Sequence, residues 1–170
     1  MLMSDSDRAR NIKALAERSI YVENVLIHSF VAKLSSVVWS RNPEDALQVF
    51  YAEVGDSGFD VVLGFLSQVR YVQLKQAHDE KEGWGRYSVR LSFSDLPGSC
   101  VVLRLYSLCS LVLASFRFLG STPDVSMPDM TGLRVIKSPG RRNLAGEQKS
   151  RAQYRDVPIR RFRDRMSAEG

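Results

Sequence analysis

The segment 58–77, GFDVVLGFLSQVRYVQLKQA, constrains the fold more than any other part of the chain. Two apolar runs rich in β-branched and aromatic residues flank a short polar step at 67–68, which is typical of two strands joined by a tight turn. This apolar hairpin nevertheless keeps Asp60 at its start, and Gln73 and Lys75 near its end. Because burying such groups is costly unless they are paired or bound, they indicate either a wet rim of a sheet or a functional site.

The register of this hairpin decides which of the polar side chains can meet, because side chains alternate between the two faces of a strand. Gln73 and Lys75 share a face, since they are two residues apart. A two-residue turn at 67–68 places Asp60 opposite Lys75, whereas a four-residue turn centred one position earlier places Asp60 opposite Gln73. Both registers cluster the three groups at one end of the hairpin, with cross-strand neighbours about 5 Å apart. A three-residue loop would separate them.

The N-terminal region is predicted to be helical from residue 4 to about 40. Ser4 or Asp5 can cap the start, no proline or glycine occurs before Pro43, and apolar residues recur near helical spacing. A break near Ser19 would divide this region into two helices.

The remaining segments favour strands and loops. Segment 86–97 fits either a strand or a short helix ended by a Pro-Gly pair, and 139–153 is expected to be an exposed, mobile loop. Strands are predicted over 47–55, the two arms of the hairpin, 99–106, 111–119 and 154–162.

These elements predict one α+β domain (helices and strands in the same unit, with α/β character) over residues 1–170, with a central mixed β-sheet covered by the N-terminal helices. Within it we expect three parts. They are N-terminal helices at 1–42, a sheet core at 47–119 with its hairpin at 59–77, and a loop-rich basic part at 120–170.

Composition excludes several classes of protein. No apolar run reaches the roughly 18 residues of a membrane span, and the window 99–120 is interrupted by Arg104 and Arg117. The N-terminus carries no signal-peptide core. Cys100 and Cys109 have neither a CxxC spacing nor a nearby histidine, which favours free thiols and a cytoplasmic location.

The charge is uneven along the chain. Segment 134–165 holds eleven Lys and Arg against three acids, a net +8, so the rest sums to −3 against a total of +5. This asymmetry favours an anionic partner, with nucleic acid first; a solvated basic tail is the alternative. Trp84 could stack on a base or pack against the sheet. The expected phosphate-contacting residues are Arg141, Arg142, Lys149 and Arg151.

The polar cluster of the hairpin suits a specific chemistry. A carboxylate and an amide oxygen are hard ligands of the kind Mg²⁺ prefers. An adjacent ammonium can orient or deprotonate a water and offset charge on a phosphate. Together they would serve metal-assisted hydrolysis of a phosphodiester. The alternative is a cross-strand ion pair between Asp60 and Lys75 at a wet sheet end, worth about 0–1 kcal/mol.

The residues that carry this cluster resemble the PD-(D/E)xK nuclease superfamily, the restriction-endonuclease-like nucleases. The matching pieces are Asp60 in GFDVVL, Gln73-Leu74-Lys75 in VQLK, and Glu23 in YVENVL on the second expected helix. The order of elements also fits that superfamily's αβββαβ core. From about residue 20 to 165, the chain further resembles uncharacterised bacterial proteins with a GyDvvl…R-x-iQLK…GCVV…fG…lPd layout.

This resemblance implies roles for individual residues. Asp60 would be the main ligand of Mg²⁺ or Mn²⁺, with Gln73 in the place of a second acid and the Leu74 carbonyl completing the coordination. Lys75 would be the catalytic lysine, and Glu23 would reach the site from the helix. Phe59 stands where the motif has proline, and the neutral Gln73 should weaken metal affinity.

The resemblance implies a metal-dependent endonuclease acting on DNA. The alternative is a catalytically inactive module of the same fold that binds nucleic acid or a protein partner. The long N-terminal helices also offer a surface for homodimer formation.

Other polar residues are weaker candidates. Glu53 could supply a spare carboxylate more readily than Asp56. His28 follows Glu23 by five residues, so it faces elsewhere on the helix and is expected to be partly buried; His78 is expected at the rim of the site. No GxxxxGK[ST] or GxGxxG loop is present.

Overall fold

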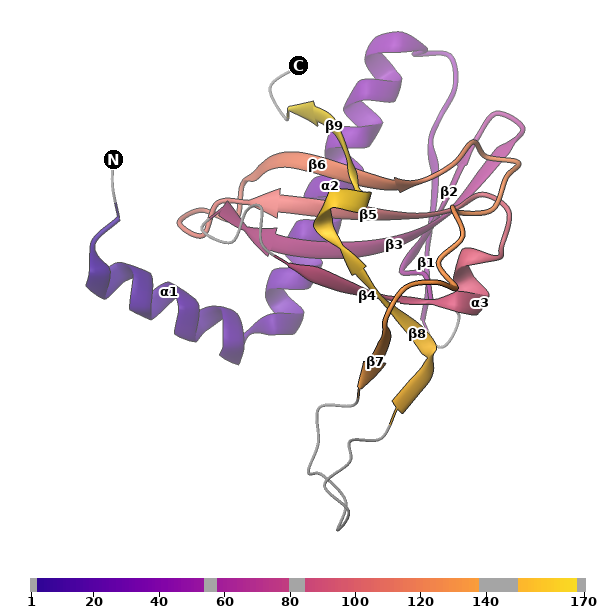
Figure 1. The fold of residues 1–170 in the computed structure, drawn as a ribbon. Helices are drawn as coiled ribbons and strands as arrows, with labels where there is room; N and C mark the ends of the chain where they lie inside the picture. Colours follow the sequence, from indigo (N-terminus) through magenta and orange to yellow (C-terminus); the bar gives the residue numbers. More distant parts are fainter. Residues whose placement is uncertain (1–2, 54–57, 80–84, 138–149, 168–170) are drawn as a thin grey trace.

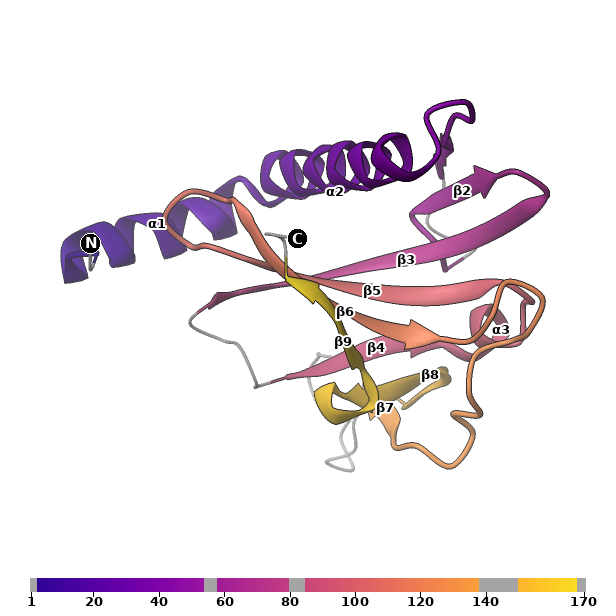
Figure 2. The same cartoon turned by 90° about the horizontal axis from the view of Figure 1, so that it is seen from above.

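The molecule is arranged in three layers. The computed structural model describes residues 3–53, 58–79, 85–137 and 150–167. A long helix, α2 (Ser19–Arg41), covers one face of a six-stranded mixed sheet, and a three-stranded sheet lies on the other side (Figure 2). The α+β class expected from the sequence is confirmed, whereas the second sheet was not expected.

The predicted pair of N-terminal helices is confirmed. Helix α1 (Asp5–Glu17) begins after Ser4, whose Oγ accepts a hydrogen bond from the Asp7 backbone N–H at 3.1 Å. The helix ends at Arg18, which leaves helical geometry with φ −121° and ψ 34°, and α2 starts at the next residue. Helix α1 buries no residue and extends away from the larger sheet (Figure 1).

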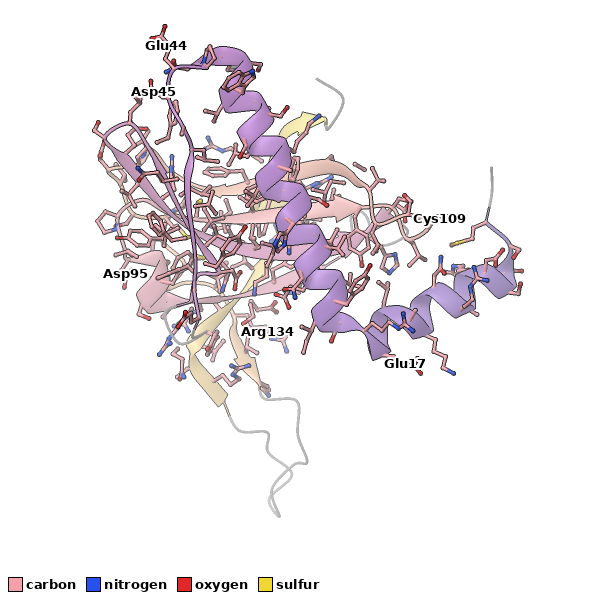
Figure 3. The ribbon with its side chains drawn as sticks, turned by 180° about the vertical axis from the view of Figure 1, so that it is seen from behind. Glu17, Glu44, Asp45, Asp95, Cys109 and Arg134 are labelled. Atoms are coloured by element: carbon pink, nitrogen blue, oxygen red, sulfur yellow. The ribbon has the colours of Figure 1, made fainter. Side chains whose placement is uncertain are left out.

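Helix α2 presents one face to the larger sheet, across which it runs (Figure 3). Its buried residues are Val22, Leu26 and Phe30, each four positions after the last, so they form a single stripe along the helix.

The larger sheet has the strand order β1-β2-β3-β5-β6-β9. Its strands are β1 (Gln48–Tyr51), β2 (Val61–Phe65), β3 (Gln68–His78), β5 (Ser99–Tyr106), β6 (Leu113–Gly120) and β9 (Arg163–Ser167). Strands β3 and β5 are parallel, and the other neighbouring pairs are antiparallel.

The smaller sheet has the order β4-β8-β7, with all pairs antiparallel. Its strands are β4 (Arg86–Arg90), β7 (Val135–Lys137) and β8 (Ser150–Pro158). Segment 86–97 therefore resolves into both predicted alternatives, since β4 is followed directly by the one-turn helix α3 (Leu91–Ser94). This short helix, with β4, connects the parallel strands β3 and β5.

The predicted C-terminal strand over 154–162 is wrong in its bounds. Strand β8 starts at Ser150, inside the segment expected to be a loop, and ends at Pro158, which has no N–H for a further ladder bond. A 3₁₀ turn, η3 (Ile159–Arg161), and β9 follow. The described residues after Gly120 thus contain the strands β7, β8 and β9, of which the sequence predicted only one. Arg160 and Arg161 lie on the turn and do not alternate across a strand.

The hairpin in segment 58–77 adopts the second of its two expected registers, with Asp60 opposite Gln73. Phe65 pairs with Gln68 and Val61 with Val72, so the turn residues are Leu66 and Ser67. Leu66 has φ 53°, the left-handed conformation that tight hairpin turns require. Continued by one residue, this register sets Asp60 opposite Gln73.

Both faces of the larger sheet are buried. On the α2 side, the core includes Val72, Leu74 and Val102 together with α2. On the other side, Val101 and Leu103 belong to a second core that includes residues of the smaller sheet, such as Val89 and Val157. Every residue of β5 is buried, which is typical of a central strand covered on two sides.

Substitution of Gly98 by alanine is expected to lower the free energy of unfolding by about 2 kcal/mol or more. Gly98 has φ +77°, and a Cβ there would lie 2.8 Å from the carbonyl oxygens of both Val69 and Pro123. Urea denaturation measures the loss. Gly132→Ala is the matched control, because a Cβ at that exposed position meets nothing within 4 Å. Equal midpoints for the two variants would contradict the strain at Gly98.

Candidate functional site

The Asp60 carboxylate is fixed at the edge of β3, at the point where β2 begins. The Asp60 N–H donates to the Val72 carbonyl at 2.9 Å, which continues the hairpin ladder by one bond. Its Oδ2 then accepts a hydrogen bond from the Leu74 backbone N–H at 2.6 Å. The carboxylate therefore takes the place of the next ladder partner of β3, and its position is set by two backbone contacts.

The Leu74 carbonyl points toward the same edge as Asp60. In a strand, the N–H and C=O of one residue point to the same side, and successive residues alternate sides. The Tyr71 N–H donates to the Gly98 carbonyl on the β5 side, while the Val72 carbonyl accepts from Asp60 on the β2 side. The backbone N–H and the backbone C=O of Leu74 therefore both point to the β2 side. This places two of the three predicted oxygen ligands at one edge.

Gln73 supplies a buried oxygen that makes no hydrogen bond. Its side chain is 8% exposed, and Oε1 has no hydrogen-bond partner within the described part of the chain. Buried polar atoms are nearly always satisfied, so an orphaned amide oxygen beside a carboxylate is compatible with a ligand position. By strand alternation, Gln73 lies on the face of β3 that is turned toward the smaller sheet.

Lys75 lies two residues further along on the same face as Gln73. Burial lowers the pKa of Lys75 below its usual value of 10.5, and the negative charges of Asp60 and Glu23 partly oppose this shift. Glu23 is an exposed residue of α2, and its negative charge raises the pKa of this lysine. The charges of Asp60 and Glu23 therefore both act on Lys75.

Arg104 is a member of the cluster that the sequence reasoning missed. It is 1% exposed on β5, pairs with Gln76 in the β3–β5 register, and donates from Nη2 to Gln76 Oε1 at 3.1 Å. Burial lowers the pKa of Arg104 to about 10, against the opposing effect of Asp60 and Glu23. An arginine in the middle of the apolar run SCVVLRLY was the available signal, because a charge in a buried strand needs a partner.

The cluster therefore contains two acidic and two basic groups. Its Coulombic contacts link Asp60 and Glu23 with both Lys75 and Arg104. The two cations lie on opposite faces of the sheet, because Lys75 shares the face of Gln73 whereas Arg104 pairs with Gln76 and lies on the α2 side.

The two histidines do not join this cluster. His28 is exposed, which contradicts the expected partial burial; its Nδ1 lies 2.8 Å from the Asn24 carbonyl and its ring stacks on Tyr51. His78 is buried and meets Tyr106 edge-on, with ring centroids 6.3 Å apart, so it does not line an exposed rim. Glu53 is exposed beyond the end of β1.

Several predicted residues lie outside the described part of the chain; they are Asp56, Trp84, Arg141, Arg142 and Lys149. Arg151 is described, and its guanidinium lies 4.1 Å from the centroid of the Tyr154 ring. Some of the basic residues have internal roles in the smaller sheet. Arg155 donates to three backbone carbonyls, and Arg86 pairs with Asp156.

The donor set fits a hard divalent cation, although it is poor in charge. In residues 3–53, 58–79, 85–137 and 150–167, no group of three or more His, Cys, Asp or Glu side chains is placed to hold a metal ion. The predicted ligands are instead one carboxylate, one backbone carbonyl and one amide oxygen. Oxygen ligands of this kind suit Mg²⁺, which retains several waters, and the unsatisfied Gln73 Oε1 provides the orphaned acceptor.

Comparison with protein-family models, with curated proteins and with solved structures gave no match. What the structure itself defines is an α+β protein with a mixed sheet and a polar cluster at its edge. Among the described residues, no helix is long and apolar enough to cross a membrane.

Replacing Asp60 by asparagine is expected to lower the pKa of Lys75 further, because the substitution removes a negative charge that raises it. The pKa follows from NMR titration of the lysine side-chain Cε and Nζ signals, assigned with Lys75→Arg. Asp95→Asn, at the end of α3, is the control and should leave the titration unchanged. An unchanged or raised pKa in Asp60→Asn would contradict the coupling.

Replacing Asp60 by alanine is expected to lower the free energy of unfolding by about 1–3 kcal/mol, because the Leu74 N–H loses its acceptor. Asp60→Asn should cost less, since its amide oxygen can still accept this bond. Equal urea midpoints for Asp60→Ala and the unmodified chain would show that the bond does not position the carboxylate.

Proposed function

We propose that this protein is a metal-dependent, nuclease-like hydrolase that cleaves phosphodiester bonds in DNA. The observation that carries the proposal is the hydrogen bond from the Leu74 N–H to the Asp60 carboxylate. Lys75 follows Leu74 directly on β3. This arrangement brings a hard anionic ligand, a carbonyl oxygen and an amine to one edge of a sheet, as the PD-(D/E)xK resemblance implies.

Asp60, the Leu74 carbonyl and Gln73 would hold Mg²⁺ or Mn²⁺. When bound, the ion would supply the positive charge that stabilises negative charge developing on the phosphate. Lys75 would act on the attacking water. Because burial lowers its pKa, a larger neutral fraction is available to accept a proton than for an exposed lysine at the same pH. Glu23 would hold the lysine in place through its opposite charge.

The surroundings of the site favour a polyanionic substrate. Gln73 and Lys75 point toward the side of the larger sheet on which the smaller sheet lies. The exposed basic residues on or beside that smaller sheet include Arg134, which Figure 3 labels, Lys137, Arg160 and Arg161. Such side chains can contact a phosphate backbone without reading its sequence.

A second candidate is a catalytically inactive module of the same fold that binds nucleic acid or a protein partner. The observation that favours it is Gln73, a neutral buried residue in the place of the second acid. A single carboxylate ligand should bind a divalent cation weakly, because affinity falls with the number of charged ligands.

Plasmid, single-stranded DNA and RNA incubated with the full chain in Mg²⁺, Mn²⁺ or EDTA test the first candidate. We expect metal-dependent cleavage of DNA that falls by about 100-fold or more in Asp60→Asn and Lys75→Gln, the range attributed to one acid–base group. Asp95→Asn is the matched control and should retain activity. Gln73→Glu should strengthen Mn²⁺ binding measured by calorimetry.

Two results would contradict this candidate. Cleavage that persists in Asp60→Asn and Lys75→Gln would exclude the proposed site. Salt-sensitive binding of DNA without cleavage, even in Gln73→Glu, would contradict the hydrolase and support the catalytically inactive module.

A further inference from the structure

An apolar pocket of about 410 Å³ lies between the C-terminal half of α2 and the larger sheet. It opens near the hairpin turn, where Phe65 and Gln68 line it, and so lies at the other end of the hairpin from Asp60. Pockets for small ligands usually fall between about 300 and 1,000 Å³. The walls are mainly apolar, and include Phe30, Leu34, Val37, Leu63, Val102 and Phe116.

The charged residues that line this pocket are all basic. They are Lys33 on α2, Arg70 on β3 and Arg117 on β6, and no acidic residue of the described part of the chain lines it. Arg117 pairs with Leu103 of the core on the smaller-sheet side, so its side chain points to the opposite face of the sheet, and the positive charge of the pocket comes from Lys33 and Arg70. The Nη1 atom of Arg70 is buried and has no hydrogen-bond partner within the described residues. Its guanidinium lies 5.8 Å from the centroid of the Phe118 ring, so it borders the apolar wall directly. A buried guanidinium nitrogen without an acceptor favours an anionic ligand.

The remaining ionisable group in the wall, the Cys100 thiol, does not supply that anion. Burial raises the pKa of the Cys100 thiol to about 11, so the thiol stays neutral at physiological pH even though Arg70 opposes the shift. Among the described residues, the pocket therefore combines apolar walls with positive charge and is lined by no carboxylate.

We propose that this pocket binds a fatty carboxylate, with the headgroup on the Arg70 guanidinium and the alkyl chain along the apolar walls. A carboxylate can accept two parallel hydrogen bonds from a guanidinium, and the alkyl chain gains from leaving water. The pocket shares no residue with the Asp60 cluster, so this inference stands apart from the proposed nuclease function.

Calorimetry with the full chain tests the proposal, with dodecanoate as the probe below its micelle concentration. Dodecyltrimethylammonium is the matched ligand, with the same alkyl chain and the opposite charge. We expect dodecanoate to bind, and the cation to bind at least about tenfold more weakly, as the loss of a charged hydrogen bond implies. Equal binding of both, or no heat with dodecanoate, would overturn the proposal.

Two variants locate the binding site. Arg70→Gln should weaken dodecanoate binding by about tenfold or more, and Leu34→Trp should weaken it by filling the pocket. Lys13→Gln, an exposed cation on α1, is the control and should bind as the unmodified chain does. Circular dichroism checks that each variant folds. If Arg70→Gln does not fold, the two oppositely charged ligands still decide the question on the unmodified protein. Unchanged affinity for dodecanoate in folded Arg70→Gln would exclude this pocket as the binding site.

Discussion

The parallel pairing of β3 with β5 is the contact on which the rest of the fold depends. All eight residues of β5 are buried, so both faces of the sheet around it must be covered. Helix α2 covers one face, and the smaller sheet lies on the other (Figure 2). A parallel pair also requires the chain to return to the starting end of the sheet. Here the return contains β4 and α3, and it thereby places β4 of the smaller sheet on the face that carries Gln73 and Lys75.

The polar cluster follows from where β2 begins relative to β3. The ladder includes Val61, and Asp60 adds one further backbone bond before its side chain takes over as acceptor for Leu74. Beyond Val72, no strand among the described residues pairs with this edge of β3, so its backbone groups there are open to a side chain or a ligand. An edge left open in this way would otherwise attract another strand. The Asp60 carboxylate satisfies one backbone group of this edge, the N–H of Leu74.

Arg104 changes the interpretation of the cluster. An ion pair between Asp60 and Lys75 alone would be the modest contact of many sheet ends. The observed charges are two cations and two carboxylates, which come from α2, the residue before β2, β3 and β5, with one cation in the core. Because Arg104 is 1% exposed, replacing Asp60 or Glu23 would remove a negative charge that offsets the cost of burying its guanidinium.

The sequence by itself determined the two N-terminal helices, the strand at 99–106 and the hairpin with its parity, because capping residues, apolar spacing and alternation are local signals. It also identified Asp60, Gln73, Lys75 and Glu23 as groups to be explained. It could not choose between two registers, because Leu66 carries no side-chain preference for positive φ, and it gave no account of Arg104. Only the tertiary structure decided these points. Register, the second sheet and the burial of a charge depend on contacts between residues far apart in the chain, which local propensity does not encode.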